Sequence, residues 1–353
     1  MTSSRILVTG GAGFIGSHLV DRFLASGAAV TVIDDLSNGK RDRVAAGATF
    51  HPHDIRSPEA AALVRAGDFD AICHFAAQMD VRKSVADPIN DASRNILGTL
   101  NLLEAVRTGS PRTRLIFSST GGAVYGDFDP PPSRETFEKN PESPYGIAKL
   151  SVEYYLAYYA RVHGLDVAAL RYANVYGPRQ DPHGEAGVVA IFCERLLSGK
   201  SLRIFGDGSQ TRDYVYVGDV VEANVRAATR PLPKAGRLDA RAFNIGTGVA
   251  TSVVALAAAL QAAAGTNLSN EFAPHRPGRC RVDPKAFEFG ACRRPTRSEV
   301  DTPTRNEVEH CNRLGRTYRV VIGRWHQTNA VPNAQLLGAS RNRAIQHLRV
   351  RAM

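Results

Sequence analysis

Short apolar runs alternate with longer amphipathic segments through the first half of the chain. Residues 5–9 form an apolar run that ends in glycines, and residues 14–25 then repeat apolar side chains at helical spacing. Further apolar runs lie at 29–33, 71–75, 115–118 and 167–170, and helical patterns at 90–107 and 151–163. Strands that alternate with helices predict right-handed βαβ units, and therefore an α/β fold with a doubly wound parallel sheet. Beyond residue 177 the alternation loosens, which predicts a smaller α/β C-terminal lobe.

Composition narrows the class of protein. The 353 residues are 43% hydrophobic and 22% charged, which excludes a disordered or fibrous chain. No apolar run reaches eighteen residues and no secretory signal precedes the first strand, so we expect neither a membrane span nor export. The five cysteines show no framework spacing, which is typical of a reducing compartment and predicts a cytoplasmic location.

The net charge of +10 is unevenly distributed. Residues 279–353 contain 15 Lys and Arg against 6 Asp and Glu, whereas the rest of the chain carries 29 against 28. The basic character therefore belongs to a C-terminal tail without helical or strand periodicity. Two interpretations stay open for this tail: a basic extension that binds nucleic acid, or a disordered, diverged or frame-disrupted end. We favour the second and expect no nucleic-acid partner.

A glycine-rich turn follows the first strand. Gly10, Gly13 and Gly16 give a GxxGxxG spacing that opens the first helix, where backbone N–H groups can approach a pyrophosphate. Asp34 ends the second strand and can accept hydrogen bonds from a ribose 2′-OH. No arginine follows it immediately to bind a 2′-phosphate. These features predict a Rossmann-type nucleotide-binding fold that prefers NAD to NADP.

The sequence contains no group of residues with the spacing of a known metal site. His51, His53 and Asp54 lie close together in sequence, but no second group of ligands stands at a recognisable spacing. The adjacent Cys73 and His74 end a strand, where a buried structural pair is the simpler interpretation. We expect no metal.

A proton-transfer pair stands at the start of a helix. Tyr145 and Lys149 are four residues apart and therefore share one helix face. A lysine ammonium beside a phenol favours the phenolate and lowers its pKa from the usual value near 10, so that the tyrosine becomes a usable base.

At this point the chain resembles the extended short-chain dehydrogenase/reductases, and within them the UDP-glucose 4-epimerase group. The matching segments are TGGAGFIG (9–16), DDLSNG (34–39), HFAAQMDVRKSV (74–85), DASRNILGTLNLLEA (91–105), FSSTGGAVYGD (117–127), SPYGIAK (143–149), RYANVYGPRQ (171–180), FGDGSQTRDYVYVGDV (205–220), FNIGTG (243–248) and PHRPG (274–278). Together they cover residues 4–278.

The resemblance implies a set of functional residues. The catalytic ones are Thr120, Tyr145 and Lys149. Those that contact NAD are Gly10, Gly13, Phe14, Ile15, Gly16, Asp34, Asn38, Asp54, Ile55, Phe75, Ala76, Ala77, Asn95, Tyr145, Lys149 and Tyr172. Those that hold the nucleotide sugar are Thr120, Asn174, Val189, Arg212 and Arg276. An extra glycine after Thr120 leaves Ser119 as an alternative catalytic hydroxyl, and Tyr214 is either part of a uridine pocket or core. Met79 replaces the lysine that the family carries at that position.

The resemblance also implies an activity. Tyr145 removes the proton of the sugar 4-OH while hydride leaves C4 for NAD, and the 4-keto sugar takes hydride back on its other face. This would interconvert UDP-glucose and UDP-galactose. Dehydrating relatives carry Asp-Glu after the catalytic threonine, where this chain has Gly121 and Gly122. The alternatives are a 4-epimerase of UDP-glucuronate or UDP-N-acetylglucosamine, and an inactive NAD-binding relative.

The expected organisation has three parts. Residues 1–176 form the NAD-binding domain, residues 177–278 form an interleaved nucleotide-sugar lobe, and residues 279–353 are the atypical tail. The resemblance further implies a homodimer whose small-molecule partner is a UDP-sugar.

Overall fold

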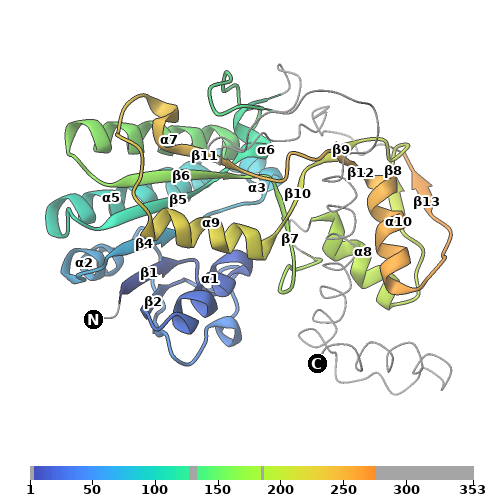
Figure 1. Cartoon of the computed structure of the whole chain (residues 1–353), viewed down its shortest axis with the longest axis horizontal. Coiled ribbons are helices and arrows are strands. Elements are labelled where there is room, and N and C mark those ends of the chain that lie inside the picture. The colour runs from blue at the N-terminus through green and yellow to red at the C-terminus, as the bar shows by residue number, and fades with distance from the viewer. Residues whose placement is uncertain (1–3, 127–132, 184–186, 275–353) are drawn as a thin grey trace.

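The computed structural model describes residues 4–126, 133–183 and 187–274. Seven strands form its main sheet in the order β11-β6-β5-β4-β1-β2-β3, and every neighbouring pair is parallel (Figure 1). The strands are β1 (Arg5–Thr9), β2 (Ala29–Ile33), β3 (Thr49–His51), β4 (Ala71–His74), β5 (Arg114–Thr120), β6 (Val167–Tyr172) and β11 (Ala242–Ile245). The predicted Rossmann-type α/β fold is confirmed.

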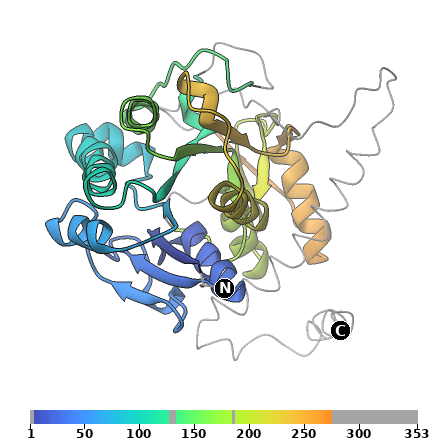
Figure 2. The same ribbon diagram turned by 60° about the vertical axis from the view of Figure 1, so that its left-hand side comes forward.

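Helices cover both faces of this sheet. One face carries α1 (Phe14–Ala25) and α9 (Val217–Thr229), and the other carries α2 (Pro58–Ala66), α5 (Gly98–Gly109) and α7 (Pro144–Val162), as Figure 2 shows. In β1, Ile6 and Val8 belong to the first of these cores and Leu7 to the second. Strands buried on both faces have near-continuous apolar sequences, which is why the apolar runs predicted the strands of this sheet.

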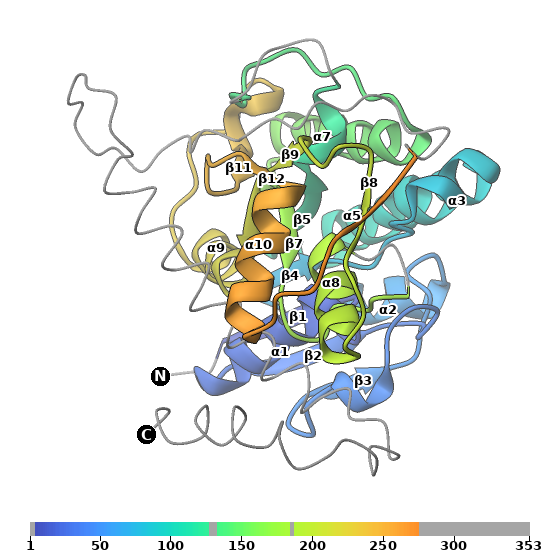
Figure 3. The same cartoon turned by 90° about the vertical axis from the view of Figure 1, so that its right-hand side faces the viewer.

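A smaller lobe stands at the carboxyl ends of the strands (Figure 3). It contains α8 (Val188–Leu197), α10 (Val253–Ala264), β8 (Arg203–Phe205) and β13 (Glu271–Ala273), packed around Phe192, Leu202, Ile204, Leu256 and Leu260. The short strands β7 (Asn174–Tyr176), β10 (Tyr214–Tyr216), β9 (Thr211–Arg212) and β12 (Thr251–Ser252) connect it to the sheet. Because α9 and β11 return to the main sheet, the two parts interleave in sequence. The boundary at 176/177 stays a prediction.

Two helical segments differ from the expected ones. The pattern over 90–107 corresponds to α4 (Pro88–Ala92), a π-helical turn η2 (Ser93–Leu97) and α5. The helix expected at 151–163 begins instead at Pro144, because Pro144 suits the first helical turn and the Ser143 hydroxyl caps it by accepting from the Gly146 amide at 3.1 Å. The remaining short elements are η1 (Arg41–Arg43), α3 (Val81–Ala86), α6 (Gly121–Val124) and η3 (Leu238–Arg241).

Candidate active site

The glycine turn after β1 is packed too tightly for side chains. A Cβ at Gly10, whose φ is +70°, would lie 2.6 Å from the Ala76 nitrogen, and one at Gly16 would lie 2.2 Å from the Gly10 oxygen. The loops that follow β1 and β4 therefore meet where the strand order reverses, which is where open α/β sheets bind ligands. No side chain caps the N-terminus of α1 at Gly13, so the amides of its first turn, at Phe14 and Ile15, suit a pyrophosphate.

Asp34 is built into this turn. Its carboxylate accepts hydrogen bonds from the Ala12 and Leu36 amides, both at 2.9 Å, and the side chain is buried. Burial raises the pKa of Asp34, against the effect of these two amides. A carboxylate oriented by the loop that it contacts is suited to a ribose hydroxyl.

The neighbouring predicted cofactor residues differ in exposure. Asn38 is exposed and Ile55 is buried. Asp54 pairs with Arg56 at 2.6 Å, and this hydrogen bond lowers the pKa of the Asp54 carboxyl. No metal cluster of three or more His, Cys, Asp or Glu occurs among residues 4–126, 133–183 and 187–274.

A buried polar network supports the end of β4. Asn95 bonds the backbone of Gln78 in both directions at 2.9 Å and donates to Asp91 at 3.0 Å. The half-buried Phe75, Ala76 and Ala77 lie between this network and the glycine turn. Asn95 is 2% exposed, and its amide already has these three partners, so its structural role is evident. Its predicted contact with NAD stays a prediction, as do those of the three residues beside it.

The predicted catalytic residues meet at the carboxyl end of β5. Lys149 lies beneath Tyr145, with its Nζ 5.8 Å from the centre of the phenol ring. The same Nζ donates to the Ser118 carbonyl at 2.8 Å and lies 4.6 Å from the centre of the Phe117 ring. Thr120 is the last residue of β5 and is half-buried. The structure thus brings Tyr145 and Lys149 together beside the end of β5, the strand that Thr120 ends.

The two candidate hydroxyls have different environments. Ser119 is buried, and its hydroxyl donates to Glu153 at 2.5 Å. Within the described part of the chain the Thr120 hydroxyl has no hydrogen bond. Thr120 is therefore the hydroxyl that a substrate could engage without breaking an existing contact.

Lys149 is the main electrostatic feature of the site. It is 3% exposed, and burial lowers its pKa to about 8, whereas the negative charges of Asp91 and Glu153 act in the opposite direction. On the β4 side, His74 bonds Thr9 and Thr99, and burial lowers its pKa to about 3. A neutral histidine adds no second positive charge beside the ammonium.

The residues predicted to bind the nucleotide sugar differ in how far their side chains are exposed. Asn174 is exposed on β7, and Arg212 lies half-buried on β9 with its Nη1 donating to the Thr211 carbonyl at 2.8 Å. Val189 is buried in the core of the smaller lobe, so its backbone is the part available to a ligand. Tyr214 is buried in that same core, and its hydroxyl has no hydrogen-bond partner among the described residues.

The remaining predicted site residues are Tyr172 and Arg276. The Tyr172 side chain is buried, stacks on Phe75 and donates its hydroxyl to Asn224 at 3.0 Å, so its ring is held by the protein itself. Arg276 and the tail at 279–353 lie outside the described residues.

The buried charged residues that sequence reasoning missed include Asp91, Glu153 and Arg171, which lie near the end of β5. Arg171 is fully buried and donates to both oxygens of Glu153, at distances down to 2.6 Å. A signal was available for Glu153, because it follows Lys149 by four residues and so extends the face of Tyr145 and Lys149 by a turn. No comparable spacing marks Arg171 or Asp91.

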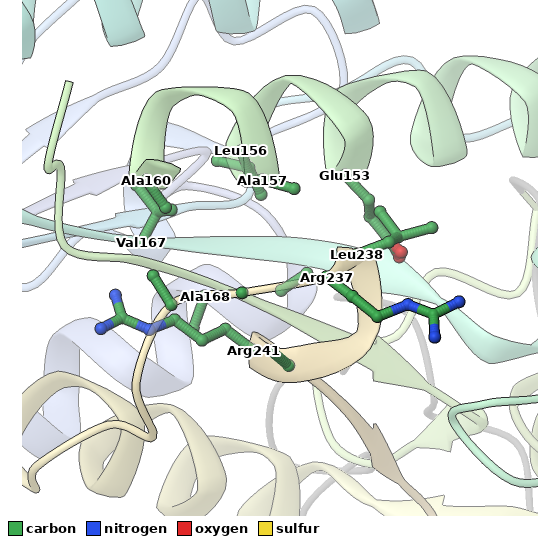
Figure 4. A pocket seen from close by; sticks show the side chains of 13 residues that line it. Glu153, Leu156, Ala157, Ala160, Val167, Ala168, Arg237, Leu238 and Arg241 are labelled. Carbon is green, nitrogen blue, oxygen red and sulfur yellow. The ribbon is translucent and has the colours of Figure 1, made fainter. Parts of the chain in front are cut away.

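A small cavity borders Glu153 between α7, β6 and residues 235–241 (Figure 4). Its volume of about 20 Å³ suffices for roughly one water molecule. Ligand pockets are typically of about 300–1,000 Å³, so this cavity is not a nucleotide-sugar site.

Comparison with known proteins agrees with this geometry. Residues 6–246 match the model of the NAD dependent epimerase/dehydratase family. The chain is 46% identical over 287 residues to a UDP-glucose 4-epimerase of Mycolicibacterium smegmatis, an alignment that covers 79% of this chain and 90% of that protein.

Two solved structures share the fold at substantial identity. The UDP-glucose 4-epimerase of Thermotoga maritima, with UDP-glucose, is 40% identical with a TM-score of 0.80, covering 92% of this chain and 99% of its own. The Thermus thermophilus UDP-glucose 4-epimerase in complex with NAD is 39% identical with a TM-score of 0.75, covering 93% of this chain and all of its own.

The matches and the geometry together show the class of protein: the chain is an α/β enzyme with a Rossmann-type cofactor site and a tyrosine–lysine pair. It belongs to the NAD dependent epimerase/dehydratase family. The expectation of NAD as cofactor is thereby confirmed, and the uncapped glycine turn and Asp34 are features that fit it. No helix among the described residues is long and apolar enough to cross a membrane.

Proposed function

We propose that the protein is a UDP-glucose 4-epimerase, which interconverts UDP-glucose and UDP-galactose through a 4-keto sugar. The observation that carries the proposal is the meeting of Tyr145, Lys149 and Thr120 at the end of β5, in a chain 46% identical to a protein of that name. When bound, NAD supplies a hydride acceptor that can return the hydride.

The chain's own residues perform the proton transfer and the orientation. Tyr145 takes the proton of the 4-OH and later returns it. Lys149, buried against Ser118 and Phe117, provides the positive charge that stabilises the phenolate form of Tyr145. The free hydroxyl of Thr120 orients the reacting sugar oxygen, and this assignment replaces the choice between Ser119 and Thr120.

Dehydration is disfavoured by the same residues. It requires an acid that protonates a leaving hydroxyl, and the two residues after Thr120 are Gly121 and Gly122. Glu153 is the nearby buried acid, but its oxygens are engaged by Arg171 and Ser119. An epimerase needs no additional acid.

The remaining predicted roles belong to this proposal. Arg212 and Asn174 hold the diphosphate and the nucleotide, since an arginine can donate two hydrogen bonds to phosphate oxygens. A firm hold on the diphosphate leaves the sugar free to rotate, which is what exchange of its two faces requires. We also place the enzyme in the cytoplasm, where NAD and UDP-sugars meet and thiols stay reduced.

A homodimer is part of the proposal. The face of α7 opposite Tyr145 and Lys149 carries exposed apolar side chains, and Leu97 in the turn before α5 is also exposed. The large apolar residues of α7 that are exposed are Ile147, Tyr154, Tyr155, Tyr158 and Val162. A surface of this kind is suited to a two-fold contact with a second copy. Light scattering on the purified protein should give twice the monomer mass, and Tyr154→Glu should give one copy.

The activity is tested by supplying UDP-galactose to purified protein and measuring UDP-glucose with a coupled dehydrogenase. Conversion without added NAD is expected, because the cofactor is regenerated in every cycle. A panel with UDP-N-acetylgalactosamine and UDP-galacturonate identifies the preferred sugar. Protein that contains NAD but converts none of these compounds would contradict the proposal.

A further inference from the structure

Three successive turns of α7 face the end of β5. Tyr145, Lys149 and Glu153 are spaced by four residues and therefore lie on one side of the helix. Lys149 donates to the Ser118 carbonyl at 2.8 Å, and the Ser119 hydroxyl donates to Glu153 at 2.5 Å. The two residues that precede Thr120 are thus both held from α7.

Thr120 depends on these contacts for its position. Its own hydroxyl has no hydrogen bond within the described part of the chain, so the backbone at the end of β5 determines where that oxygen lies. Lys149 holds the backbone of Ser118, and Glu153 holds the side chain of Ser119. The distance between the Thr120 hydroxyl and the Tyr145 phenol therefore depends on how β5 is fixed against α7.

Glu153 is itself firmly oriented. It is 2% exposed, and Arg171 of β6 donates from Nε to Oε1 at 3.0 Å and from Nη2 to Oε2 at 2.6 Å. Arg171 is completely buried and also donates to the Tyr125 hydroxyl at 2.8 Å and to Asp239 at 3.0 Å. The carboxylate that holds Ser119 is thus fixed by a planar guanidinium with contacts on two further segments.

A buried ion pair is a poor way to stabilise a fold, since well-packed apolar residues of similar volume often do as well or better. Here the ion pair also fixes geometry, because Oε1 of Glu153 accepts hydrogen bonds from both Arg171 and Ser119. We propose that Glu153, oriented by Arg171, is a positioning residue for the epimerisation: it holds Ser119 and thereby places the Thr120 hydroxyl opposite Tyr145. This inference rests on the proposed function.

The test uses Glu153→Gln and Ser119→Ala, singly and together, with UDP-galactose at about pH 6.5, where Lys149 stays protonated. Each single variant should lower kcat by about 10- to 100-fold, the loss expected when reacting groups are displaced by about 1 Å. KM and the content of bound NAD should change less than about threefold. Glu153→Gln places an amide NH2 group against the Arg171 guanidinium and so disturbs the orientation of the group that Ser119 bonds, whereas Ser119→Ala removes the hydroxyl itself. Because both variants act on the same contact, the kcat of the double variant should lie within about threefold of the lower of the two single-variant values.

Asp239→Asn is the matched control. It also removes a carboxylate from Arg171, at 3.0 Å, but Asp239 makes no hydrogen bond or ion pair with β5 among the described residues. It should lower the melting temperature while leaving kcat within about twofold of wild type. Ser119→Thr, which retains a hydroxyl, should keep more activity than Ser119→Ala.

Several outcomes would overturn the inference. An unchanged kcat in Ser119→Ala would do so even if Glu153→Gln failed to fold, and additive losses in the double variant would mean that Glu153 acts by another route. A lowered melting temperature with normal kcat would make the Glu153–Arg171 pair purely structural. Failure of the proposed function is distinguishable, because wild-type protein would then not convert UDP-galactose.

Discussion

Replacing Lys149 with methionine tests the electrostatics of the site through stability. Lys149 is 3% exposed, and burial lowers its pKa from 10.5 to about 8. Between these two values the unfolded chain binds more protons than the folded one, so this group makes the wild type more stable as pH rises. Below pH 8 both states carry the proton, and the cost of the buried charge is fully present.

The pKa difference sets the size of the effect. Two and a half pH units correspond to about 3 kcal/mol of destabilisation at neutral pH, at about 1.4 kcal/mol per unit. By about pH 9.5 the folded state has released its proton, and the remaining cost is roughly 1.4 kcal/mol. The free energy of unfolding of Lys149→Met minus that of wild type should therefore fall by about 2 kcal/mol between about pH 7 and about pH 9.5.

The measurement is urea unfolding of both proteins, freed of NAD, at several pH values in this window. Only the difference between the two is interpreted, because the lysines and tyrosines that lie away from Lys149 titrate equally in both. Lys200, exposed after α8, provides the control: Lys200→Met should show no such trend. A Lys149→Met difference that stays constant, or that grows with pH, would refute the assignment of Lys149 as a destabilised buried ammonium.

Three further variants probe the neighbouring parts of the site. Tyr145→Phe should lower kcat at least about a hundredfold with bound NAD retained, and near-normal turnover would exclude Tyr145 as the base. Asp34→Ala should weaken NAD binding and reduce the preference for NAD over NADP. If calorimetry gave the variant the NAD affinity of wild type, the only role of Asp34 would be to order its loop. Gly16→Ala should abolish NAD binding and lower the free energy of unfolding by about 1–3 kcal/mol, because the new Cβ would lie 2.2 Å from the Gly10 oxygen. This loss is expected although alanine is a better helix former than glycine. Gly236→Ala, with 3.5 Å to its nearest neighbour, should be nearly neutral, and a stabilised Gly16→Ala protein would contradict the packing argument.

The central sheet was predictable because its strands are buried on both faces. In β1, Ile6, Leu7 and Val8 are all buried although they point to alternate sides, so the run appears continuous in the sequence. For α7 the apolar pattern alone predicted only 151–163, because Tyr145 and Lys149 interrupt it, and the start near Tyr145 followed only from the spacing of that pair. A helix that carries polar catalytic groups into the interior loses the periodicity by which helices are found.

The cofactor turn and the tyrosine–lysine pair were predictable because short-range spacing encodes them. The glycines of the turn are three residues apart, and Tyr145 and Lys149 are four residues apart. Such spacings reflect the local backbone geometry of one segment, so they can be recognised in the sequence. Arg171, in contrast, joins β6 to α7, to Tyr125 and to the segment that contains Asp239. Such a contact exists only after distant segments have been brought together, and its partners have no fixed separation in sequence.

The buried charges around β5 also form a balanced set. Lys149 and Arg171 are positive, and Asp91 and Glu153 are negative, all four being at most 3% exposed. Each isolated charge would be costly in this interior, but two of each sign leave the four side chains without a net charge. A bound nicotinamide cation would add one positive charge, and an ionised Tyr145 phenol next to Lys149 would offset it. Under the proposed function this ionised form of Tyr145 is the one that would accept the proton of a sugar hydroxyl.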